Sequence, residues 1–93
     1  MPYKVSKVIS GNTFIVCSNW EWNGETGNIV QAIGLDTPEK NDPGFEYAKR
    51  NLKLLICGEE VDLIEPFKII EGRLLCKVTF EGKDLSDYFT KYE

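Results

Sequence analysis

The sequence predicts a mainly β fold: a five-stranded barrel with one main helix between the third and fourth strands and a short C-terminal helix. Two observations carry this prediction. Short apolar runs separated by glycine-containing turns recur along the chain, while one central stretch repeats its apolar residues at helical spacing. The 93 residues, of which 42% are hydrophobic, fit one small domain spanning 1–93.

The first half of the chain predicts three strands joined as a meander. Residues 3–9 and 14–17 are apolar-rich runs on either side of a Gly-Asn turn. Residues 19–24 alternate polar and aromatic side chains and end in glycine, so the second strand should continue to a hairpin tip with both indoles on one face. Residues 28–33 form the third predicted strand.

The central stretch predicts the main helix. Asp42 and Pro43 are an expected N-cap and first-turn proline, and Gly58 is an expected stop. Between them, apolar residues recur at helical spacing: Phe45, Ala48, Leu52, Leu55 and Ile56.

The last third predicts two more strands and the terminal helix. Residues 61–64 and 74–80 are the strands, on either side of Pro66, and Glu81-Gly82 turns the chain outward. Residues 84–92 form the short helix, with Leu85, Tyr88 and Phe89 on one side.

Composition excludes several classes of function. The chain has no histidine, which removes His-dependent hydrolase chemistry and His-ligated metals and leaves oxygen ligands suited to Ca²⁺ or Mg²⁺. Cys17, Cys57 and Cys76 show no zinc or disulfide spacing, so we expect reduced, mostly packed thiols. No apolar run approaches the ~20 residues that cross a bilayer. We expect a cytoplasmic monomer without membrane contact, or a secreted protein if a leader is removed.

Three short motifs carry possible chemistry. Asp36-Thr37-Pro38-Glu39 follows a predicted strand directly, so a rigid turn presents two carboxylates. Ser10-Gly11-Asn12-Thr13 is a polar turn between the first two strands, and Gly72-Arg73 precedes the fifth. Each also has a plain structural interpretation, as turn chemistry for the first two and as a surface charge for Arg73.

Taken in chain order, the three motifs resemble those of the staphylococcal-nuclease (thermonuclease-like) family, over most of the chain from Val5 to Phe89. The resemblance implies an oligonucleotide/oligosaccharide-binding (OB) type barrel and a Ca²⁺-dependent phosphodiester hydrolase. Asn12 and Gln31 stand where the family pattern has an aspartate and an arginine.

The resemblance also implies a role for each matching residue. The metal positions are Asn12, Asp36 and the carbonyl of Thr37, Glu39 is the general base, and Gln31 and Arg73 take the two phosphate-binding arginine positions. A neutral Asn12 removes a charge from the ligand shell, so Ca²⁺ is expected to bind weakly. Gln31 lacks the fixed charge and the paired donors of a guanidinium.

Nucleic acid is a candidate partner through local features only. The net charge of −4 has the wrong sign for long-range attraction of phosphates, so contacts would come from Lys4, Lys7 and Arg73. Trp20 and Trp22 could stack on bases. Paired tryptophans on a hairpin also commonly cover a core edge or a partner protein.

Three functions therefore compete. The first is a catalytically impaired nuclease-like domain that binds nucleic acid or a nucleotide weakly at a degenerate calcium-type site. The second is an active metal-dependent nuclease, and the third is a protein-interaction module. The sequence leaves enzymatic activity open, because Asp36, Glu39 and Arg73 are retained while two other positions are replaced.

Overall fold

The computed structural model describes residues 2–35 and 42–88, and its elements follow the predicted order. The elements are β1 (Pro2–Val8), β2 (Thr13–Trp22), β3 (Glu25–Ala32), α1 (Phe45–Ile56), β4 (Glu60–Ile70), β5 (Arg73–Phe80), β6 (Lys83–Asp84) and the 3-10 turn η1 (Leu85–Tyr88). Strands β1 to β5 close into a barrel in the order β3-β2-β1-β4-β5, and β5 returns to pair with β3. The predicted five-stranded barrel, with one helix between its third and fourth strands, is confirmed.

The closing pair, β3 and β5, is parallel, whereas the other strand pairs are antiparallel. Three of the hairpins are tight because each turns on two residues with positive φ, a conformation that matches strand twist. These turns are Asn23-Gly24, Glu71-Gly72 and Glu81-Gly82. Each turn fixes the register of its hairpin, which determines which side chains share a face.

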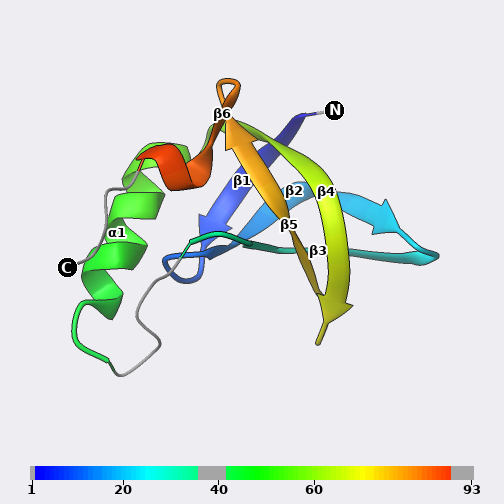
Figure 1. The fold of residues 1–93 in the computed structure, drawn as a ribbon, viewed down its shortest axis with the longest axis horizontal. Coiled ribbons are helices and arrows are strands. Elements are labelled where there is room, and N and C mark those ends of the chain that lie inside the picture. Colours follow the sequence, from blue (N-terminus) through cyan, green and yellow to red (C-terminus); the bar gives the residue numbers. More distant parts are fainter. Residues whose placement is uncertain (1, 36–41, 89–93) are drawn as a thin grey trace.

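The barrel interior is apolar and continuous. Val5, Phe14 and Val30 are fully buried strand residues. Leu52 and Ile56 of α1 join the same cluster, so α1 buries one face against the barrel. In Figure 1, α1 and η1 lie together at one end of the barrel, and the β2–β3 hairpin tip lies at the far end.

The predicted helix is confirmed, but its cap is not the predicted one. The N-cap residue is Gly44, with φ 87°, and it makes no side-chain capping bond. Asp42 contributes its backbone carbonyl instead, which accepts a hydrogen bond from the Phe45 amide at 3.2 Å. The prediction of Asp42 as N-cap was wrong because an additional left-handed residue precedes the first turn of α1.

Strand β4 is longer than predicted, since it runs through Pro66 to Ile70. A register break between Ile64 and Lys68, with Glu65 at φ 49°, makes an irregularity there. A proline is tolerated at such a position because no regular ladder bond is lost. The sequence pattern could not show that pairing resumes beyond it.

The predicted terminal helix is a short strand, β6, followed by η1, and residues 89–92 of that prediction lie outside the described part. Asp84 Oδ1 accepts hydrogen bonds from the Ser86 amide at 2.9 Å and the Ser86 hydroxyl at 2.8 Å. These local bonds favour a tight turn over an α-helix. Leu85 is buried and Tyr88 packs on the core, as predicted for that side. No helix in residues 2–35 and 42–88 has the length and apolarity to span a membrane.

Candidate phosphate-binding face

The structure describes three of the six residues that the family pattern assigns to the site: Asn12, Gln31 and Arg73. Asp36 and Thr37, which the resemblance assigns to a metal, and the candidate base Glu39 lie outside the described residues. The geometry of the site is therefore built from the turn before β2, the end of β3 and the start of β5.

Gln31 and Arg73 lie on the same outer face of the barrel. The β3–β5 register pairs Ile29 with Arg73 and Gln31 with Leu75. Their chain neighbours Val30 and Leu74 are buried, so alternation turns Gln31 and Arg73 outward. One strand spacing and two residues of rise separate the pair by about 8 Å between Cα atoms.

Arg73 is an exposed cation between two isoleucines. In its row of the sheet it stands between Ile29 on β3 and Ile70 on β4. Among residues 2–35 and 42–88, no carboxylate lies within ion-pair distance of its guanidinium. Within this described part, no carboxylate therefore competes with an anion from solvent for its five N–H donors.

Asn12 is built into its turn. Its Oδ1 accepts hydrogen bonds from the Ser10 hydroxyl at 3.0 Å and the Thr13 hydroxyl at 2.9 Å. Its backbone carbonyl accepts the Ala32 amide at 2.8 Å, which ties the turn to the end of β3, one residue after Gln31. The turn, Gln31 and Arg73 therefore belong to neighbouring elements.

The described donors do not by themselves fit a calcium ion. Asn12 is neutral, and both acceptor positions of its Oδ1 are used by hydroxyls. Within the described part of the chain, no group of three His, Cys, Asp or Glu side chains comes together as a metal site would need. A hard dication prefers several charged oxygens, which these residues do not supply.

The two lysines predicted to meet phosphates lie apart from Arg73. Lys7 lies on β1 and pairs with Ile15 on β2, and β1 is separated from β5, the strand that carries Arg73, by β4 on one side of the barrel and by β2 and β3 on the other. Lys4 lines an open depression of about 540 Å³ together with four acids: Glu59, Glu60, Asp62 and Glu81. That acidic surrounding opposes the binding of a phosphate at Lys4.

Trp20 is a core residue. It is 2% exposed, its Nε1 donates a hydrogen bond to the Ile29 carbonyl at 2.9 Å, and its ring covers Gly27. Trp22 lies on the same face and is half-buried against the core. In this arrangement a base has no free face of Trp20 to stack on. Of the two tryptophans predicted to stack on bases, only Trp22 stays a candidate.

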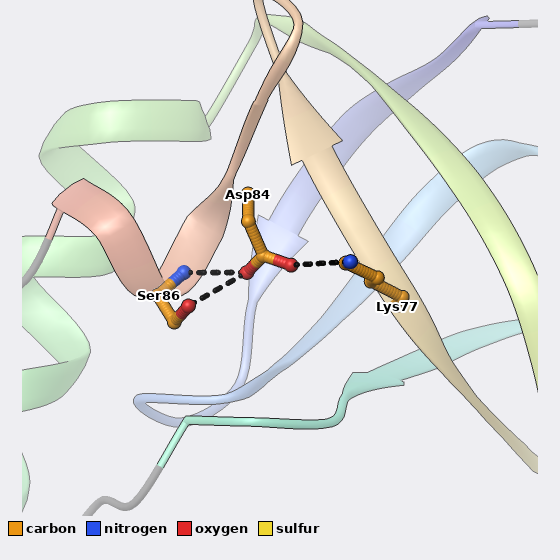
Figure 2. Close-up of polar contacts among 3 residues, drawn as sticks. All are labelled: Lys77, Asp84 and Ser86. Carbon is orange, nitrogen blue, oxygen red and sulfur yellow. Dashed lines mark hydrogen bonds and ion pairs between the residues drawn. The ribbon is translucent and has the colours of Figure 1, made fainter.

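The outer face of β5 carries a second cation, Lys77, whose charge is paired. Figure 2 shows Asp84 between Lys77 and Ser86, with Lys77 Nζ 3.6 Å from Asp84 Oδ2. Burial, the largest single influence, raises the pKa of Asp84, but the Ser86 hydrogen bonds and the Lys77 charge together lower that pKa below its ordinary value. Lys77 therefore contributes less to the field of this face than Arg73 does.

Cys76 lies on the inner side of the same strand and takes no part in surface chemistry. It pairs with Ala32 in the β3–β5 register and is fully buried. Burial raises the pKa of its thiol to about 12, so the group stays protonated near neutral pH.

Lys68 is a residue of this face that sequence reasoning missed. The Glu71-Gly72 turn pairs Ile70 with Arg73, and counting back two residues pairs Lys68 with Leu75. Lys68 is exposed. It points outward because its partner Leu75 lies two residues after Arg73 on β5, and residues two apart in a strand share a face. The two-residue Glu-Gly turn in the sequence could have predicted this pairing. That prediction would also have required β4 to continue beyond Pro66.

In comparisons with known proteins, no family model and no curated protein sequence matches the chain.

Proposed function

We propose that this chain is a catalytically impaired staphylococcal-nuclease-like domain, which binds the phosphate groups of nucleic acid or a nucleotide weakly at a degenerate calcium-type site. The closed barrel, with its helix between the third and fourth strands, is compatible with the OB-type barrel that the motif resemblance implies. The observation that carries the proposal is the parallel β3–β5 pairing, which puts Gln31 beside Arg73 on one outer face.

The chemistry of this face supports binding more than catalysis. A guanidinium gives a phosphate two parallel, charge-assisted hydrogen bonds, and Arg73 is exposed to do so. Gln31 offers a neutral amide donor in the place of a second guanidinium. Loss of a transition-state arginine costs about 10³- to 10⁵-fold in rate in other phosphoryl-transfer systems.

The metal is the weakest part of the proposed site. The family resemblance assigns Ca²⁺ to Asn12, Asp36 and Thr37, and the only one of these side chains in the described part is neutral and already hydrogen-bonded. The proposed phosphate binding therefore assigns no step to the metal. Arg73 supplies the charge, and Gln31 supplies an additional donor.

Backbone amide NMR with a short oligothymidylate tests this proposal. The native chain should show chemical-shift changes that saturate at high ligand concentration and centre on residues 29–32 and 73–75. Lys49, Arg50 and Lys53 lie on α1 and form the comparison surface, because they offer charge without the β3–β5 geometry. Shifts centred on α1, or no shifts at low salt, would contradict the proposal.

A further inference from the structure

We propose that the oligonucleotide lies along the β4–β5 hairpin, with phosphates on Arg73 and Lys68 of the outer face and one base on the exposed ring of Phe67, the residue before Lys68. This inference rests on the proposed function and deepens it, because it names a single-stranded ligand and two residues that the motif resemblance does not include.

The hairpin register places the two cations as neighbours. Glu71 and Gly72 have φ values of 51° and 79°, which makes a two-residue turn of fixed register. Ile70 therefore pairs with Arg73, and Lys68 pairs with Leu75. Lys68 and Arg73 are diagonal neighbours on one face, about 7–8 Å apart between Cα atoms, so an extended backbone can present separate phosphates to them.

Phe67 supplies the aromatic surface. It is 62% exposed, whereas Trp20, the first aromatic predicted to stack, is 2% exposed. The Lys68 ammonium lies over the Phe67 ring, 5.3 Å from its centroid, so the ring is next to a charge for phosphate although the two residues are consecutive in β4. Stacking on an exposed aromatic ring tolerates any base.

The combination favours single-stranded nucleic acid over an acidic polypeptide. Both ligands satisfy cations, but only a nucleotide offers a planar base next to its phosphate. Two exposed acids of the hairpin, Glu71 in the turn two residues before Arg73 and Glu65 two residues before Phe67, should weaken an anionic ligand by like-charge repulsion.

Fluorescence titration of Phe67→Trp with a short oligothymidylate tests the stacking directly. We expect quenching of the new indole that follows the binding curve. Leu54→Trp is the matched control, because Leu54 is 78% exposed on α1, away from the hairpin. Equal quenching in both variants would overturn the inference.

Charge and ring variants test the same contact independently. Lys68→Gln and Phe67→Leu should each weaken binding about five- to tenfold, and Lys68→Gln should also reduce the slope of log affinity against log salt by about 0.7. Glu71→Gln should strengthen binding two- to threefold, about the effect of one screened charge at the surface. Glu81→Gln removes a charge at the same turn position of the next hairpin and should leave the affinity unchanged.

The outcomes separate the two proposals. If Arg73→Gln weakens binding while Lys68→Gln and Phe67→Leu bind like the native chain, this inference fails and the proposed function stands. If polyglutamate competes as well as the oligothymidylate and Phe67→Leu has no effect, the face binds acidic polypeptide and the inference fails. Absence of binding by the native chain at low salt overturns both.

Discussion

Gln31 and Arg73 lie on the adjacent strands β3 and β5, on the outer face of the barrel, about 8 Å apart between Cα atoms. This relationship depends on a parallel pair between strands that are more than 40 positions apart in sequence, and it forms only when the barrel closes. It turns two distant sequence positions into neighbours on one face, as the proposed phosphate binding requires.

Replacing Asn12 by Asp should strengthen calcium binding. Native affinity is expected at about 1 mM or weaker, and Asn12→Asp should improve it about tenfold, because a carboxylate adds charge to the ligand shell. The turn should survive, since an aspartate oxygen still accepts the Ser10 and Thr13 hydroxyls. Calorimetry with Ca²⁺ measures the change. Tight native binding, or an unchanged affinity in the variant, would show that Asn12 is not a ligand position.

Adding Gln31→Arg to Asn12→Asp should restore measurable phosphodiester cleavage in the presence of Ca²⁺. The two changes act on the metal and on the phosphate of one transition state, so neither alone should do as much. Cleavage of a labelled oligonucleotide is the measurement, and a triple variant that adds Arg73→Ala controls for contaminating nucleases. A folded double variant without activity would place the defect elsewhere, and strong native activity would refute the impaired-site account.

Substitution of Gly27 by Ala should destabilise the β2–β3 hairpin. A Cβ at Gly27 would lie 2.8 Å from Cζ2 of Trp20, whose ring is buried and held by its bond to Ile29. We expect a loss of about 1–2 kcal/mol in the free energy of unfolding, measured with urea. The same substitution in a Trp20→Phe background should cost clearly less. An equal cost in both backgrounds would rule out this clash as its cause.

Stability should fall on the acid side partly through Asp84. Because the folded-state pKa of Asp84 is lower than its ordinary value, its contribution is present above about pH 4 and is lost as the pH falls through the folded-state pKa. Asp84→Asn should therefore flatten the loss of unfolding free energy below pH 4, and Asp87→Asn, at an exposed residue of the following 3-10 turn η1, is the charge-matched control. Parallel curves for Asp84→Asn and the native chain would contradict this assignment.

The sequence predicted the barrel because its signals are local. Alternation, helical spacing around Ala48 and Leu52, and the glycine turns each act within a few residues. The length of β4 was missed because its continuation beyond Pro66 depends on pairing with β5, which restores the ladder at Lys68. Gly44 was not predicted as the N-cap because its left-handed conformation depends on the direction from which the chain enters α1.

The candidate site was less predictable than the fold. Gln31 and Arg73 were assigned through the family resemblance, and the strand register makes them neighbours. The two tryptophans were weighed equally, yet Trp20 is buried because Gly27 opposite it leaves room for the ring. Lys68 was overlooked because its position beside Arg73 follows from the register of one hairpin, and Phe67 was overlooked because it is exposed at the register break before Lys68.

The salt dependence of oligonucleotide binding by Arg73→Gln tests the central claim most directly. The native chain and the variant are titrated with the same short oligothymidylate across a range of salt concentrations. Lys53→Gln on α1 serves as an equal change in net charge at a distant site. We predict that Arg73→Gln weakens binding at low salt about tenfold and lowers the salt slope by about 0.7, the value for one phosphate contact on a single strand, while Lys53→Gln keeps the native slope. Equal slopes for Arg73→Gln and the native chain would show that Arg73 does not contact phosphate and would contradict the account.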